Sequence, residues 1–194
     1  MLKQIAKGHR SIVYGCKHRG KMAVKKVEKK DINVLNRIQN EIYWLKKLNN
    51  YNIGPKLYSS DKNYFICEFV EGERIIDFLK KSKNPLKIIL KIIDQCRKLD
   101  KLNVDKKEMN YPYKHIIISM NKVTFIDFER ARFSLKPKNV TGFFSFLLSK
   151  LIYSLLQEKN LNLDRDKIKE LLQNYKKTYS DDYFKKLIIE IKLI

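Results

Sequence analysis

The stretch Gly20-Lys21-Met22-Ala23-Val24-Lys25-Lys26-Val27 decides how the chain begins to fold. A glycine followed by mostly apolar residues is typical of a β-strand that starts after a tight turn. Two shorter stretches of the same character, 2–6 and 11–17, precede it, with glycines near the turns. The first 27 residues therefore predict a meander of three strands.

A single amphipathic helix and a hairpin are expected next. Asp31 is a suitable N-cap, and apolar residues recur at helical spacing from there to residue 50. Asn52-Ile53-Gly54-Pro55 breaks the pattern, after which 56–60 and 63–70 alternate as two strands. The expected result is a five-stranded antiparallel sheet with one helix.

A change of pattern at Gly72 divides the chain into a β-rich part, 1–71, and a mostly helical part, 72–194. A strand pair, 115–119 and 122–126, interrupts the helical part. The fold class expected is α+β. Helices are expected over 75–81, 85–102, 142–157, 166–175 and 181–192.

Charged side chains stand at the ends and faces of these elements. Strand alternation allows Lys25 to face inward, which would turn Lys26 away. Because a buried ammonium is costly unless it is paired, it needs a carboxylate from another element. Glu41, on the following helix, is the candidate, and the alternative is a solvated charge on that helix.

A second carboxylate, Asp127, ends the strand 122–126, which is expected to place it at the mouth of a cleft and not in a core. Oxygen ligands suit a hard cation such as Mg²⁺, so a strand-end aspartate is a reasonable holder. Glu129 can add a carboxylate to the same ion or can pair with Arg130 or Arg132; the pairing is favoured.

The order of these fragments resembles the protein-kinase core. Ala6-Lys7-Gly8-His9-Arg10-Ser11-Ile12-Val13 is similar to the kinase Gly-rich loop, with Ala and Ser at its first and third glycines. Met22-Ala23-Val24-Lys25 resembles the strand lysine motif, and Asp127-Phe128-Glu129 resembles Asp-Phe-Gly. Over about 2–132 the chain resembles a small atypical serine/threonine kinase of the lineage that includes the RIO kinases and the kinase of the tRNA threonylcarbamoyl-adenosine complex. Within that lineage it is most similar to the short predicted archaeal serine/threonine kinases.

The resemblance implies a two-lobed kinase-like fold, a small lobe with a five-stranded sheet and one helix, and a reduced helical lobe. It implies ATP and Mg²⁺ as cofactors and a hydroxyl of a protein substrate as acceptor. Implied nucleotide-binding residues are Ala6, Gly8, Ser11, Val13, Lys25, Glu41, Cys67, Glu68, Val70 and Lys114. Implied catalytic residues are Glu108, Lys25 and Asp127, and implied metal ligands are Asp127, His115 and Asn110.

The expected catalytic loop departs from the kinase pattern His-Arg-Asp-Leu-x-x-x-Asn. Glu108-Met109 best matches Asp-Leu, with Asp105 as the substitute base. In the kinase pattern the Asn precedes the next strand, and His115 lies at the corresponding place, although two residues too far along the chain. Asn110 is the alternative metal ligand. An Ala-Pro-Glu segment is absent. An active kinase and an ATP-binding pseudokinase or ATPase subunit both remain open; a small-molecule kinase is less favoured.

The chain has 42 Lys+Arg against 21 Asp+Glu, a formal net charge of +21. The positive electrostatic field of such a charge favours the binding of polyanions. The basic surface therefore either serves an RNA or ribonucleoprotein partner or reflects a lysine-rich genome. We expect no membrane segment and no leader peptide, hence a cytoplasmic protein. Cys16, Cys67 and Cys96 lie in apolar stretches and are expected to be reduced core thiols.

Overall fold

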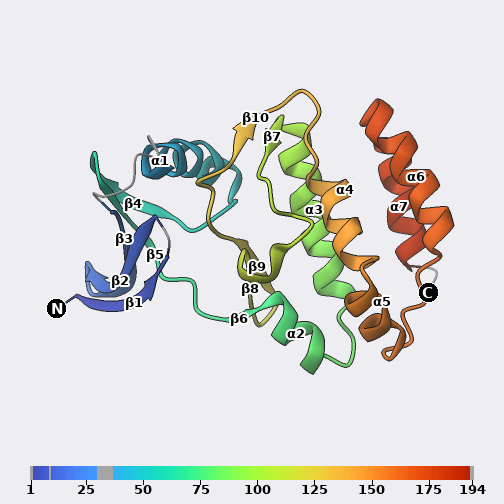
Figure 1. The fold of residues 1–194 in the computed structure, drawn as a ribbon, viewed down its shortest axis with the longest axis horizontal. Coiled ribbons are helices and arrows are strands. Elements are labelled where there is room, and N and C mark those ends of the chain that lie inside the picture. The colour runs from blue at the N-terminus through green and yellow to red at the C-terminus, as the bar shows by residue number, and fades with distance from the viewer. Residues whose placement is uncertain (1, 9, 30–36, 193–194) are drawn as a thin grey trace. The chain divides into compact units, whose positions relative to one another are not determined.

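The computed structural model describes residues 2–8, 10–29 and 37–192 of an α+β protein (Figure 1). The chain forms two compact units. The first contains Met1–Gly72 together with the later segment Thr124–Ala131, and the second contains Glu73–Val123 and Arg132–Ile194. The predicted division of the chain at residue 71 therefore misses the segment Thr124–Ala131, which belongs to the first unit.

The sheet of the first unit has five antiparallel strands in the order β1-β2-β3-β5-β4. The predicted five-stranded antiparallel sheet is confirmed. A hydrogen bond from the Gly8 amide to the Ser11 carbonyl, 2.9 Å long, closes the first turn. The strands are β1 (Lys3–Lys7), β2 (Ser11–His18), β3 (Lys21–Glu28), β4 (Leu57–Ser60) and β5 (Tyr64–Glu68).

Helix α1 (Arg37–Leu48) contacts β3, β4 and β5 (Figure 1). Its apolar side chains recur at helical spacing and are buried, which is why this stretch is helical and lies against the sheet. A 3-10 turn, η1 (Asn49–Tyr51), follows it. The N-cap predicted at Asp31 lies outside the described residues.

Helices dominate the second unit, as the sequence predicts. Figure 1 shows α3 and α4 side by side, and α6 packs on α7. The helices are α2 (Ile75–Lys81), α3 (Leu86–Lys101), α4 (Asn139–Leu147), α5 (Lys150–Gln157), α6 (Arg165–Thr178) and α7 (Asp181–Lys192). The short elements are β6 (Glu73–Arg74), β7 (Val104–Asp105), η2 (Pro112–Lys114), β8 (Ile116–Ser119), β9 (Lys122–Phe125) and β10 (Arg132–Phe133). They form the sheets β10-β7 and β6-β8-β9, and at Thr124 the chain passes from the second unit into the first.

The single helix predicted over 142–157 is wrong, because the structure has two helices there. Helices α4 and α5 meet at an angle of 66°. Ser149 between them is extended (φ −65°, ψ 147°), and its hydroxyl donates to the Phe146 carbonyl at 2.7 Å. The Arg165 guanidinium donates to the Leu148 carbonyl at 3.1 Å, which satisfies a group left by the ended helix.

A buried polar network ties α3, α4 and α6 together. The Asp100 carboxylate accepts hydrogen bonds from the Asn139 amide and side chain (3.1 and 2.7 Å), the Val140 amide (3.3 Å) and the Tyr175 hydroxyl (2.8 Å). Asn139 in turn accepts from the Lys106 amide at 3.0 Å. The network therefore fixes the start of the 105–110 loop against α4.

Two further expectations concern single residues and membrane segments. The three cysteines are free, with Cys67 and Cys96 buried and Cys16 half-buried. Among the described residues, no single helix is long and apolar enough to cross a membrane, although the bent pair α4 and α5 together reaches that length and composition.

Candidate functional site

Lys26 stands at the centre of a charged cluster in the first unit. Its ammonium donates to the Glu41 carboxylate at 2.6 Å and to the Asp127 carboxylate at 3.1 Å. A third carboxylate, from Glu129, lies 3.9 Å away. Burial alone would lower the pKa of Lys26, but Glu41 and Asp127 outweigh it and raise that pKa above its usual value.

The prediction that Lys25 faces Glu41 is therefore wrong by one residue. Lys25 lies on the opposite face of β3, with its ammonium 3.9 Å from the centre of the Tyr64 ring. Because side chains of a strand alternate between faces, a shift of one residue exchanges the two lysines completely. Met22, Ala23 and Val24 are all apolar, so their pattern did not identify the inner face.

Glu41 comes from α1 and is buried, with 3% of its surface exposed. One carboxylate oxygen receives the Lys26 ammonium, and the other accepts the Phe128 amide at 3.2 Å. Burial raises the pKa of Glu41, the Lys26 charge lowers it, and the nearby Asp127 raises it again, so that it ends above its usual value. Glu41 therefore pairs with a lysine of the preceding strand, but this lysine is Lys26 and not the predicted Lys25.

Asp127 has a left-handed backbone (φ 63°), a conformation that non-glycine residues seldom adopt. Hydrogen bonds from α1 hold the segment that follows it. The Asn40 amide group donates to the Glu129 and Ala131 carbonyls, both at 2.9 Å, and the Trp44 indole donates to Ala131 at 2.7 Å. Sequence reasoning missed these anchors, because the polar groups on α1 that make them carry no motif.

Glu129 pairs with Arg10 at 3.1 Å in addition to its approach to Lys26. Arg132, one of its two predicted partners, lies instead 3.8 Å from Asp105. Carboxylate oxygens of Glu41, Asp127 and Glu129 lie within 4.8 Å of one another. Since Glu41 is fully engaged by Lys26 and Phe128, Asp127 and Glu129 are the carboxylates that suit a hard cation here.

The face of the sheet around Lys26 is apolar. Strand register puts Val13 and Phe65 directly beside Lys26, and it pairs Val24 with Cys67. Burial, followed by the charge of Glu41, raises the pKa of the Cys67 thiol to about 12. Val13 and Val24 are only half-buried and so leave apolar surface next to the ammonium.

The remaining predicted nucleotide residues belong to the same unit, except Lys114. Gly8 and Ser11 form the β1-β2 turn, with Ala6 exposed beside it and Ser11 buried. Glu68 ends β5, where its carboxylate accepts the Lys56 amide at 3.2 Å, and Val70 follows, half-buried. Lys114 lies exposed on η2 of the second unit.

The predicted loop residues of the second unit lie in different surroundings. Asp105 is buried and pairs with Lys107 at 2.8 Å. Glu108 is more open, with its carboxylate 3.5 Å from the His115 imidazole. Asn110 is exposed. Lys107 (φ 68°) and Glu108 (φ 58°) both have left-handed backbones, which direct the loop between Asp105 and Asn110.

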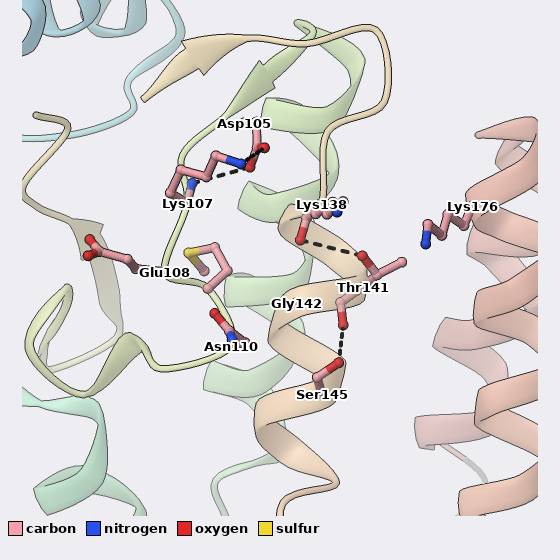
Figure 2. Close-up of a pocket in the computed structure, with 10 residues that line it drawn as sticks. Asp105, Lys107, Glu108, Asn110, Lys138, Thr141, Gly142, Ser145 and Lys176 are labelled. Carbon is pink, nitrogen blue, oxygen red and sulfur yellow. Dashed lines mark hydrogen bonds and ion pairs between the residues drawn. The ribbon is translucent and has the colours of Figure 1, made fainter. Parts of the chain in front are cut away.

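This loop and α4 line a pocket of about 390 Å³ within the second unit (Figure 2). Gly142 of α4 permits their close approach, since a Cβ atom there would lie 3.2 Å from the Met109 Cβ. The lining residues are Asp105, Lys107, Glu108, Met109, Asn110, Lys138, Thr141, Gly142, Ser145 and Lys176.

Comparison with known proteins gives one informative match. No protein-family model matches the chain. Uncharacterized protein MJ1211 of Methanocaldococcus jannaschii is 33% identical over 116 residues, which cover 57% of this chain and 98% of the archaeal protein. The chain belongs to the family of that protein. The relative's name states no activity, so membership of this family brings no function with it, and function has to be argued from the site.

Proposed function

We propose that the protein is an ATP- and Mg²⁺-dependent phosphotransferase with a kinase-like two-lobed fold, acting on serine or threonine hydroxyls. The observation that carries the proposal is the Lys26 ammonium, held at 2.6 Å from Glu41 and 3.1 Å from Asp127. Three ionisable groups from a strand, a helix and a strand end are a costly arrangement for stability alone, because Lys26 and Glu41 are largely removed from water. Their use is explained if the cluster receives a charged ligand.

Lys26 would bind phosphate oxygens of the nucleotide, and Glu41 would hold the ammonium in place. Asp127, whose side chain is 34% exposed, would hold Mg²⁺, with Glu129 as a second carboxylate. The half-buried Val13 and Val24 would contact the base, since they share the face of Lys26. Mg²⁺ would supply charge neutralisation at the transferring phosphoryl group.

Glu108 is the carboxylate that would orient the acceptor hydroxyl. It is more accessible than Asp105, with 30% of its side chain exposed against 3%. Asp105 is better suited to holding Lys107 and the loop, since the carboxylate is buried in ion pairs. Phosphoryl transfer needs mainly positioning and charge, which a glutamate can supply as well as an aspartate.

Incubation with labelled ATP and Mg²⁺ tests the proposal. Asp127→Asn keeps the shape of the side chain and removes its charge; we expect phosphoryl transfer to fall about 100-fold or more. Asp77→Asn, an exposed aspartate on α2 of the second unit, is the control and should retain activity. Undiminished transfer in Asp127→Asn would contradict the assigned metal ligand.

A second candidate is an ATP-binding pseudokinase or ATPase subunit of an RNA-associated complex. The observation in its favour is that Glu108 lies 3.5 Å from His115, a partner that competes with an acceptor hydroxyl. The net charge of +21 is compatible with an RNA surface. RNA-stimulated ATP hydrolysis without a phosphoprotein product would favour this candidate, whereas a labelled protein product would favour the first.

A further inference from the structure

We propose that the pocket between the 105–110 loop and α4 binds a phosphate group carried by the molecule that accepts the phosphoryl group. Lysines of three segments line it: Lys107 of the loop, Lys138 at the start of α4, and Lys176 of α6 (Figure 2). The proposal that the pocket binds phosphate depends only on the residues of this pocket. The proposal that this phosphate belongs to the acceptor molecule rests on the proposed function.

The three lysines differ in how their charges are compensated. The Lys107 ammonium lies 2.8 Å from the Asp105 carboxylate and is therefore neutralised. Lys138 and Lys176 are exposed, and within 2–8, 10–29 and 37–192 neither ammonium has a carboxylate at ion-pair distance. Two uncompensated positive charges around one concave surface favour an anion.

The walls of the pocket suit a small anionic group. Thr141 and Ser145 place hydroxyls on the α4 side; they donate to the Lys138 carbonyl at 3.5 Å and the Thr141 carbonyl at 2.9 Å. A volume of about 390 Å³ is large enough for a phosphate with part of its carrier. Because both hydroxyl hydrogens are directed to the helix, the donors left for the ligand are the lysines and the side-chain amide of the exposed Asn110.

Charge also orients a ligand in the pocket. Figure 2 shows Glu108 on the side of the loop away from Lys138 and Lys176. A phosphate would be repelled from the Glu108 carboxylate and attracted to the lysines at the other end. An acceptor bound in this way presents its phosphate to Lys138 and Lys176, and its hydroxyl comes within reach of Glu108 once the Glu108 side chain rotates toward the pocket that it lines.

Calorimetric titration of the full chain with inorganic phosphate, at constant ionic strength and without nucleotide, tests the pocket. We expect Lys138→Gln and Lys176→Gln each to weaken binding about tenfold. Lys177→Gln is the matched control, because Lys177 is the exposed neighbour of Lys176 on the same helix and does not line the pocket. Lys176→Arg keeps the charge and should retain binding.

If Lys176→Gln and Lys177→Gln weaken phosphate binding equally, the weakening reflects the loss of overall positive charge and not of a pocket residue, and the proposal is overturned. Phosphate binding that is unchanged in Lys138→Gln and Lys176→Gln would also overturn it. Displacement of phosphate by single-stranded RNA without terminal phosphates would assign the pocket to a phosphodiester backbone and also overturn it. The titration is repeated on Lys26→Met. If Lys26→Met still binds phosphate and the wild-type protein binds no nucleotide, the phosphate site in the pocket is supported and the proposed function is refuted.

Discussion

The charged cluster of the first unit and the buried network of the second are both built from ionisable side chains, yet they differ in how completely those groups are satisfied. Around Lys26, three carboxylates face two cations, and Asp127 keeps a third of its side chain exposed. Around Asp100, one buried carboxylate receives four hydrogen bonds from Asn139, Val140 and Tyr175. The first has charge and surface left for a ligand, and the second is closed.

Burial of a charged side chain therefore does not by itself identify the role of that side chain. Asp100 and Glu41 are each 3% exposed, and burial raises the pKa of both carboxyls. Glu41 differs because its partner, Lys26, also contacts a carboxylate open to solvent. We therefore expect substitutions in the closed network to change mainly stability, and substitutions in the open cluster to change mainly ligand binding.

The largest effect on stability is expected at Asp100. Asp100→Ala would leave the Asn139 and Val140 amides and the Tyr175 hydroxyl without an acceptor inside the core. The cost is about 3 kcal/mol of unfolding free energy, measured by urea denaturation. Asp94→Ala on the same helix, where the aspartate is exposed and pairs with Lys98 at 2.8 Å, should cost less than about 0.5 kcal/mol. Similar losses of unfolding free energy in both variants would mean that the buried network stabilises the fold no more than an exposed ion pair does.

A smaller effect is expected at Gly54, which supports the open cluster. Gly54 has φ +81°, and a Cβ atom there would lie 3.0 Å from Leu45 and 3.1 Å from Phe128. Gly54→Ala should cost about 2 kcal/mol and displace Phe128, whose amide donates to Glu41.

Gly20→Ala is the matched control for this substitution. Gly20 has a similar backbone (φ +79°) but nothing within 4 Å of the Cβ position. It should therefore show the backbone strain alone, about 1 kcal/mol, and leave nucleotide binding unchanged. Equal effects of the two substitutions on stability and binding would show that the packing around Gly54 does not support the cluster.

The smallest effect is expected at Asp181, at the edge of the closed network. Hydrogen bonds from Arg97 and Lys101 lower its pKa to about 2, below the ordinary 3.8. The folded state therefore gains stability above pH 3.8, and this gain is lost as the pH falls toward 2. Asp181→Asn should flatten the fall of unfolding free energy in that window, while Asp182→Asn on the same turn should change it less. An unchanged acid profile in Asp181→Asn would contradict the assigned hydrogen bonds.

The strands and most helices follow from local patterns, and the errors at Lys25 and at the stretch 142–157 have physical causes. Lys25 and Lys26 are adjacent and follow three apolar residues, so the alternation of side chains along the strand did not indicate which of the two lysines faces inward. The stretch 142–157 is mostly apolar and contains no proline. Ser149 is a residue type typical of helix starts, but Ser145 and Ser154 are of the same type, so the sequence did not single out the break. The Asp100 network links residues 39 and 75 positions apart, which no local pattern records.

Glu41 and Asp127 were identified because each stands at a fixed place on a predicted element, the helix after the sheet and the end of a strand. Arg10, Asn40 and Trp44 were not, because their hydrogen bonds join segments about 90 to 120 residues apart. Residues that carry a motif could thus be predicted, whereas those that hold them in place required the folded chain.

Nucleotide binding by two adjacent variants tests the central claim most directly. Lys26→Met should weaken the binding of ATP with Mg²⁺ about 100-fold, because it removes the ammonium between Glu41 and Asp127. Lys25→Met, which removes an equal charge from the other face of β3, should change it less than about threefold. The double variant Lys26→Met/Glu41→Gln avoids an unpaired buried carboxylate and should fold without binding. Equal losses at the two lysines, or a loss at Lys25 alone, would contradict the account.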